Sequence, residues 1–388
     1  MDNNGKYFIY LISCFLNSKA PTDAPNDWEE VYRLADINNV TGIIANEIKQ
    51  MPNDLRPQGN IKSHFNQNLG KTIQRYEVNK KAQDKIKSFM CENDIDFAFV
   101  KGSSVREFYP VPELRTSGDI DIIVRKENFD SVLRIFKKSD CEILQANPNV
   151  IVLNVYGVEV EVHKDADVLG NYYNGRIFDI SSKKGNEYLL DNYDRLLYVI
   201  LHLAKHLKDR GAGIRMLMDM DVCIRAIDNF DEQRLIDMCI EAGIEKCSKM
   251  LLSILKLWFD TPVNEYYALD DNLLNLLANT FLYGGVFGFR NNNLGSHYVA
   301  QASKSNTVTA KDKIKAFFRW LFPPVSSVRN MYFYSSKHKL LIPLAYAQRF
   351  FEGVFIRGKH SVNTAREIAK SNDTAMIESQ ILSELDIC

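Results

Sequence analysis

One stretch in the first half of the chain constrains the fold more than any other, because short apolar runs alternate there with an amphipathic segment. Short apolar runs bounded by turn residues predict buried strands, and apolar side chains three to four positions apart predict a helix. Read in chain order, the pattern predicts two strands, a helix placed after the second of them, and a hairpin, at 97–100, 118–124, 126–138 and 150–163. We therefore expect a compact unit built on a small mixed β-sheet.

The segments on both sides of this unit have helical patterns. Tyr7, Leu11 and Phe15 recur at helical spacing, and Asp27 stands where an N-cap precedes a helix that begins at Trp28. From Glu187 onward the pattern is helical again. The expected fold class is α+β, a small mixed sheet with helical regions at both ends of the chain. We divide the chain into four parts: an N-terminal helical region (1–93), an α/β core (94–185), a helical domain (186–300) and a basic C-terminal helical region (301–388).

The net charge is close to zero but unevenly distributed. The chain has 48 Lys and Arg against 49 Asp and Glu, a net charge of −1, which argues against a protein made chiefly to coat nucleic acid. Residues 300–360 nevertheless hold eleven Lys and Arg and only two Asp and Glu. Aromatic residues are interleaved with these cations, which is compatible with nucleic-acid binding or with a solvated face over an aromatic core.

Cysteine usage and hydropathy bear on the compartment. The seven cysteines are scattered and never spaced as Cys-x-x-Cys, which favours reduced thiols over disulfides or a zinc knuckle. No window reaches the roughly 18 uncharged apolar residues that a membrane span needs. We expect a cytoplasmic protein without a membrane partner.

Acidic residues alternate along two of the predicted strands. Residues two apart on a strand share a face, so Asp119 and Asp121 project together, as do Glu159, Glu161 and His163. Such pairs are common as solvated carboxylates at a strand edge. Side by side, however, three carboxylates can hold two Mg²⁺ ions. We expect Asp119, Asp121 and Glu161 as metal ligands and catalytic residues, with Glu159 as the alternative to Glu161.

A glycine-serine turn precedes the acidic strands. Gly102 and Ser103 follow a predicted strand and open a helix, so their backbone N–H groups and the serine hydroxyl could contact phosphates.

Two arginines and two histidines are further candidates. Arg115, just before the Asp pair, could stabilise charge on a transferred group or contact Glu113. Arg215 could reach phosphates or form an ion pair with Asp219, four residues on. The same spacing relates His202 and His206; no third zinc ligand is spaced nearby, which favours packed or substrate-lining histidines over a zinc site.

The order of glycine-serine turn, Asp-x-Asp strand and acidic strand resembles the nucleotidyltransferase superfamily, which includes polymerase beta, the aminoglycoside nucleotidyltransferases and the minimal prokaryotic nucleotidyltransferases. Within it, the chain is similar to a bacterial branch, the uncharacterised nucleotidyltransferase family. The resemblance covers most of the chain, including the Trp28 region. The shared motifs are Lys101-Gly102, Tyr109-Pro110, Arg115, Glu161-Val162-His163, residues 201–206, Gly213-Ile214-Arg215 with Asp219, and residues 321–324 and 340–345.

The resemblance implies transfer of an NMP group from an NTP such as ATP to a hydroxyl of an unknown acceptor, with release of pyrophosphate. It implies two Mg²⁺ ions on the three carboxylates, and nucleotide contacts from Lys101, Gly102, Ser103, Arg115 and Arg215. The acceptor could be a small molecule, a protein or an RNA. The alternatives are a non-catalytic nucleotide-binding or regulatory protein with the same fold, and an RNA-directed transferase that uses the basic segment.

Overall fold

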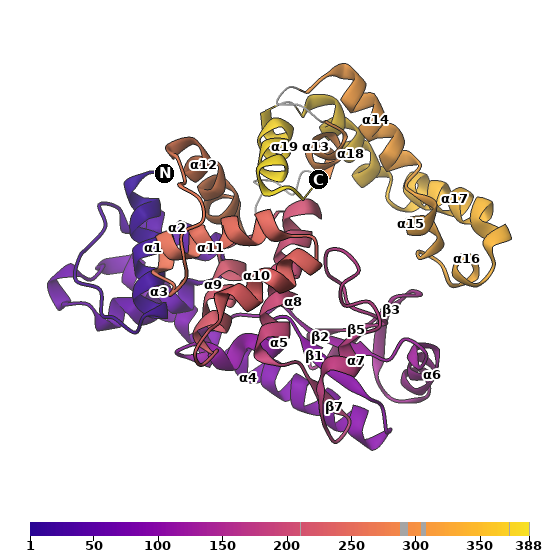
Figure 1. The fold of residues 1–388 in the computed structure, drawn as a ribbon, viewed down its shortest axis with the longest axis horizontal. Coiled ribbons are helices and arrows are strands. Elements are labelled where there is room, and N and C mark those ends of the chain that lie inside the picture. Colours follow the sequence, from indigo (N-terminus) through magenta and orange to yellow (C-terminus); the bar gives the residue numbers. More distant parts are fainter. Residues whose placement is uncertain (210, 288–293, 304–307, 372, 388) are drawn as a thin grey trace.

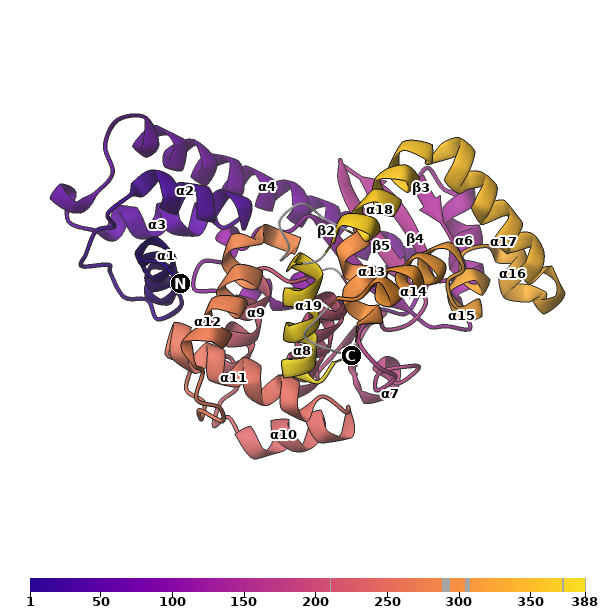
Figure 2. The same ribbon diagram turned by 90° about the horizontal axis from the view of Figure 1, so that it is seen from above.

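The computed structural model describes residues 1–209, 211–287, 294–303, 308–371 and 373–387. The fold is α+β, as predicted, with helical regions at both ends of the chain and one mixed sheet. Figure 1 shows a main body that contains the sheet, and a C-terminal group of helices that lies apart from most of it. In the view from above, these helices pass over the sheet side of the body (Figure 2).

Four helices form the N-terminal region: α1 (Asn3–Leu16), α2 (Trp28–Ile37), α3 (Thr41–Gln50) and α4 (Gly59–Glu92). The carboxylates of Asp2 and Asp27 cap α1 and α2 by accepting from backbone N–H groups of the first turn, which confirms the predicted cap at Asp27. The 34-residue α4 is mostly polar and buries a single side against the body.

The sheet has seven strands: β1 (Phe97–Val100), β2 (Asp119–Val124), β3 (Glu142–Ala146), β4 (Val150–Val155), β5 (Val158–His163), β6 (Ser182–Lys184) and β7 (Glu187–Leu189). Their order is β3-β4-β5-β2-β1-β7-β6. The strand β2 lies at the centre, parallel to β5 and antiparallel to β1. The helix α6 (Phe129–Lys138) follows β2, and β4 and β5 form the predicted hairpin.

Two strands, β3 and β6, had no prediction from the sequence, and β7 lies at Glu187–Leu189, where the sequence analysis wrongly predicted a helix. The strands β3 and β6 are edge strands with mostly exposed side chains, and β6 and β7 have only three residues each. Edge strands are often short and charged, so they lack the apolar run by which a buried strand is predicted.

The middle of the chain adds helices α8 (Asn192–Asp209), α9 (Ile214–Arg225), α10 (Glu232–Glu241), α11 (Glu245–Phe259) and α12 (Asp271–Ala278). Their buried side chains share one apolar cluster with α1–α3. A second cluster lies between the sheet, α4 and α6, and a third lies within the C-terminal helices. The four-part division of the chain remains a prediction.

The C-terminal helices are α13 (Leu294–Ala302), α14 (Ala310–Leu321), α15 (Val325–Arg329), α16 (Phe333–Lys337), α17 (Ile342–Phe351), α18 (Gly358–Lys370) and α19 (Asp373–Leu385). Phe333 packs against the cluster under the sheet, and Lys337 pairs with Asp130 of α6 at 3.2 Å. Within the residues that the structure describes, no helix combines the length and the hydropathy of a membrane span. Short helical turns complete the chain at Asn53–Leu55, Gly102–Val105 (α5), Arg106–Phe108, Pro112–Leu114, Ile177–Ile180 (α7), Asn279–Tyr283, Gly285–Phe287, Lys339–Leu341 and Glu352–Ile356.

A buried glutamate in α3 predicts that stability depends on pH. The Glu47 side chain is 1% exposed, and its burial raises its pKa to about 7, although Asn46 and Gln50 donate to one carboxylate oxygen. The folded chain therefore holds a proton that the unfolded chain has lost at intermediate pH. The free energy of unfolding should fall on the order of 3 kcal/mol as pH rises from about 4.5 to about 7. Urea unfolding at several pH values in this range measures the dependence. The free energy of unfolding of Glu47→Gln should vary less with pH than that of wild type, and an equal pH dependence would contradict the assignment.

Candidate active site

A pocket of about 450 Å³ opens between β1, β2, α4, α8 and α9. Its lining combines carboxylates with four cationic side chains and two histidines. These are Asp119, Asp121 and Asp219, then Arg75, Lys101, Arg115 and Arg215, and finally His202 and His206. Such a mixture suits a ligand that carries both negative charge and a metal ion.

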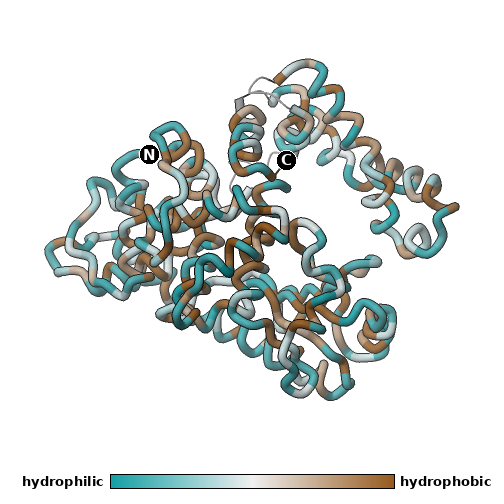
Figure 3. The backbone as a smooth tube through the Cα atoms, viewed as in Figure 1, coloured by the Kyte–Doolittle hydropathy of each residue, from teal (hydrophilic) through white to brown (hydrophobic). Residues whose placement is uncertain are grey.

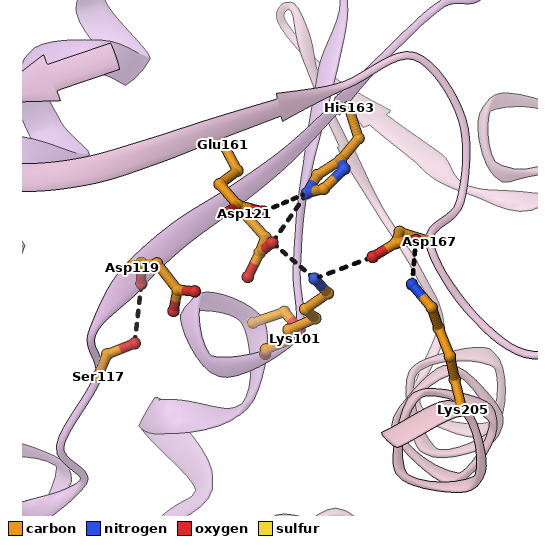
Figure 4. Close-up of polar contacts among 9 residues, drawn as sticks. Lys101, Ser117, Asp119, Asp121, Glu161, His163, Asp167 and Lys205 are labelled. Atoms are coloured by element: carbon orange, nitrogen blue, oxygen red, sulfur yellow. Dashed lines mark hydrogen bonds and ion pairs between the residues drawn. The ribbon is translucent and has the colours of Figure 1, made fainter. Parts of the chain in front are cut away.

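The pairing of β2 with β5 brings the acidic residues of both strands together. In the parallel register, Asp121 lies opposite Glu161 and Asp119 lies opposite Glu159. One ligand atom each from Asp121, Glu161 and His163 lie within 4.8 Å of one another. Figure 4 shows these three side chains converging beside Lys101.

Lys101 is the direct partner of Asp121. Its Nζ donates to Asp121 Oδ1 at 2.7 Å and lies 3.8 Å from Asp167 Oδ2. Burial alone would raise the pKa of Asp121, but Lys101 and His163 together hold it well below its usual value. The backbone of Lys101 has φ 54° and ψ −135°, a sparsely populated conformation that costs a residue with a side chain about 1–3 kcal/mol. The end of β1 thus adopts an unfavourable backbone conformation at the residue whose ammonium group reaches the carboxylates.

His163 lies between two carboxylates. Its Nε2 is 3.0 Å from Asp121 Oδ1 and 3.2 Å from Glu161 Oε2. Burial would lower the pKa of His163, but these two hydrogen bonds raise it to about 8. In this arrangement Lys101 and His163 supply the positive charge that the acidic group needs.

Asp119 lies at the exposed end of β2. The turn before it is held by α4, because Arg75 Nε and Asn79 Nδ2 each donate to Ser117 O at 3.1 Å. Ser117 Oγ in turn donates to the backbone oxygen of Asp119 at 2.8 Å. Loss of water around the carboxyl group and repulsion by the nearby Asp121 carboxylate raise the pKa of Asp119. Its carboxylate lies outside the three-residue group of Asp121, Glu161 and His163.

Arg115 forms a buried ion pair across the pocket wall. Its Nη2 and Nε donate to the two carboxylate oxygens of Asp219 at 2.6 and 3.1 Å, and Tyr109 Oη donates to the same carboxylate at 2.6 Å. The expected alternative contact with Glu113 was wrong, because Asp219 of α9 is placed opposite the guanidinium. Gly102 lies against this guanidinium, where a Cβ would overlap it. Glycine is therefore needed here for close packing, besides any contact with a ligand.

Arg215 does not pair with Asp219, so the predicted intrahelical ion pair was wrong. Asp219 is occupied by Arg115, and Arg215 Nη1 instead donates to Thr116 O and Oγ1 at 3.1 and 3.0 Å. Burial and the nearby Arg115 lower the pKa of Arg215. This arginine lines the pocket, and it forms no ion pair with a carboxylate among the residues that the structure describes.

The remaining predicted residues differ in their placement. His202 and His206 share a face of α8, as expected, with ring centroids 4.5 Å apart, and both line the pocket. Burial and Lys101 lower the pKa of His202, so its ring is neutral. Gly102 lines the pocket, whereas Ser103 is not among the described lining residues and its buried Oγ has no hydrogen-bond partner.

Four functional candidates were given no role in the sequence analysis: Arg75, His163, Asp167 and Lys205. Asp167 forms an ion pair with Lys205 and lies near the ammonium group of Lys101. Burial would raise the pKa of Asp167, but these two cations lower it to about 2. The spacing of two placed His163 on the same face as Glu161, but His163 was not taken as a ligand candidate. Arg75, Asp167 and Lys205 lie on other segments, and no local pattern distinguishes them.

A family model described as "Uncharacterised nucleotidyltransferase" matches residues 24–260. The matched region includes every side chain of the pocket described above except Val286, and it ends before the C-terminal helices. No curated protein and no solved structure gave a significant match. Because the match spans well over half of the chain and contains the acidic strands, this protein is a member of the uncharacterised nucleotidyltransferase family.

Proposed function

We propose that this protein is a metal-dependent nucleotidyltransferase that moves an NMP group from an NTP to a hydroxyl of an acceptor. The observation that carries the proposal is the convergence of Asp121, Glu161 and His163 within 4.8 Å beside a pocket with four cationic side chains. Family membership supports nucleotidyl transfer in general.

The donor set fits a divalent cation. Asp121 and Glu161 provide converging carboxylate oxygens, which Mg²⁺ prefers, and His163 adds a nitrogen that Mn²⁺ or Zn²⁺ also accepts. Asp119, two residues before Asp121 on β2, offers a third carboxylate from outside that group. We propose Asp119, Asp121 and Glu161 as the ligands of two Mg²⁺ ions. Bound there, the ions would neutralise phosphate charge and lower the pKa of an acceptor hydroxyl.

The side chains of the chain itself would bind and orient the NTP. Arg75, Arg115 and Arg215 line the pocket on the side of α4 and α9, where they can attract the triphosphate. Lys101 would hold Asp121 ionised until the metal binds, and could then donate to a phosphate oxygen. Gly102 and Ser103 remain proposed phosphate contacts through their backbone N–H groups.

A matched pair of variants on β5 tests this function. Glu161→Gln should lower Mg²⁺-dependent transfer of label from α-labelled NTPs to lysate acceptors roughly a hundredfold, because a metal ligand is lost. Glu159→Gln, two residues away on the same face and exposed, should retain activity close to wild type. Equal activity of both variants, or loss in Glu159→Gln alone, would reject Glu161 as the third carboxylate.

One observation favours a second candidate, a nucleotide-binding protein without transferase activity. Lys101 and His163 already neutralise Asp121, so the pocket can keep its acidic group folded without a metal ion. Calorimetry with each NTP, with and without Mg²⁺, separates the two functions. Binding of equal strength without Mg²⁺ and in Asp121→Asn would favour the second candidate.

A further inference from the structure

The C-terminal arm, defined here as residues 310–370, presents an unusual surface. Most of the large apolar side chains that are exposed among the described residues lie in this arm. Leu340 is 93% exposed, and Phe355 and Ile356 are 77% exposed. Figure 3 shows apolar segments alternating with polar ones along the arm. Exposed apolar area of this extent usually marks a binding surface.

The exposed side chains form rows along two helical segments. Leu340, Leu344, Phe351 and Phe355 follow one another at intervals of four and seven through α17 and its flanking turns, so they share a face. The rings of Phe351 and Phe355 stack with centroids 6.0 Å apart. On α14, the exposed side chains of Ile314, Phe317 and Phe318 stand at positions i, i+3 and i+4, so they also share a face of their helix.

Basic residues accompany the apolar rows. Residues 300–360 carry eleven Lys and Arg against two Asp and Glu. Lys315, Lys339, Arg357 and Lys359 are exposed, and none of them forms an ion pair within the described residues. The partner of this surface should therefore be anionic.

Three kinds of partner can be compared on these grounds. A second copy of the chain would bring two strongly basic arms together, and like charges oppose that contact. A nucleic acid satisfies the charge and could stack on exposed rings such as Phe351 and Phe355, but it would leave exposed aliphatic side chains such as Leu340 without an apolar partner. A bilayer with anionic lipids satisfies both properties, because lysine and arginine contact headgroups while apolar side chains enter the boundary below.

We propose that the C-terminal arm binds the surface of a membrane that contains anionic lipids, lying on it rather than spanning it. This differs from the sequence-based expectation of no membrane partner, which considered spanning segments only. The arm lies outside residues 24–260, which the family model matches, although two motifs of the sequence resemblance, at 321–324 and 340–345, lie within it. Membrane binding by the arm does not require transferase activity.

Vesicle co-sedimentation of the full chain tests the proposal. The protein should sediment with vesicles of phosphatidylcholine and phosphatidylglycerol, and much less with phosphatidylcholine alone. Replacing Lys339, Arg357 and Lys359 by Gln should weaken binding roughly a hundredfold, at about 1 kcal/mol for each lost cation. Phe355→Ser with Ile356→Ser should weaken it roughly tenfold or more.

Exposed apolar residues of the main body provide the matched control. Leu144→Ser with Leu257→Ser removes two side chains that are 48% and 56% exposed and should leave vesicle binding unchanged. Binding that is equal for both lipid mixtures, or unchanged in the arm variants, overturns the proposal. Absence of vesicle binding together with salt-sensitive RNA binding, or with dimers that the arm variants abolish, overturns it in favour of those partners.

Discussion

Asp121→Asn is expected to reduce NMP transfer about a thousandfold under the proposed mechanism. The substitution removes a proposed metal ligand and the negative charge that Lys101 and His163 both contact. Loss of several kcal/mol of stabilisation in the transition state corresponds to a change of this size. The measurement is the rate of label transfer from α-labelled NTP at saturating Mg²⁺, with circular dichroism of the same sample.

Because Asp121 is buried, its substitution could also weaken the fold. Asp119→Asn avoids this difficulty, since Asp119 is exposed at the start of β2 and its replacement leaves the buried contacts of Lys101 intact. It should lower transfer while the unfolding midpoint stays near that of wild type. Asp140→Asn, an exposed aspartate outside the pocket, is the matched control and should change neither property. Full activity in both Asp121→Asn and Asp119→Asn would reject the metal-dependent mechanism.

Asp219→Ala is expected to lower the free energy of unfolding by about 3–5 kcal/mol, the cost of leaving a buried charge without its partner. Asp219 is 7% exposed and accepts hydrogen bonds from Arg115 and Tyr109, which join the segment before β2 to α9. Its carboxylate also raises the pKa of Arg115 despite the burial of that guanidinium. Urea unfolding measures the change.

A milder variant and a control variant are needed to interpret the effect of Asp219→Ala. Asp219→Asn keeps an acceptor for Tyr109 and should cost less than Asp219→Ala. Glu245→Ala removes one partner of the exposed pair with Lys249 at the start of α11, and its unfolding midpoint should stay close to wild type. If Asp219→Ala unfolds at the same midpoint as Glu245→Ala, the buried ion pair does not stabilise the fold.

The predictions from sequence succeeded where one segment carries the whole signal. The buried strands β1 and β2, the hairpin of β4 and β5, and the cap of α2 at Asp27 all follow from local periodicity or capping chemistry. The polar edge strands β3 and β6 were missed, because a strand paired on one side and exposed to solvent needs no apolar run.

The ion pairs of the pocket are where local reasoning was wrong. The spacing of four made Arg215 and Asp219 candidate partners, and Glu113 was the alternative contact considered for Arg115. The structure instead joins Arg115 to Asp219 over a sequence separation of 104 residues. A buried carboxylate takes the cation that tertiary packing places against it, and only exposed pairs follow helical spacing dependably.

By itself, the sequence determined the alternation of acidic and apolar residues on β2 and β5, and with it which carboxylates face one way. It also determined the uneven charge of the C-terminal arm. Only the tertiary structure decided that β2 and β5 are neighbours in register and that Lys101 and His163 neutralise Asp121. It also decided that Asp167 lies between Lys101 and Lys205. Side-chain alternation is a property of one strand, whereas electrostatic partners depend on which segments the folded chain brings within a few ångströms.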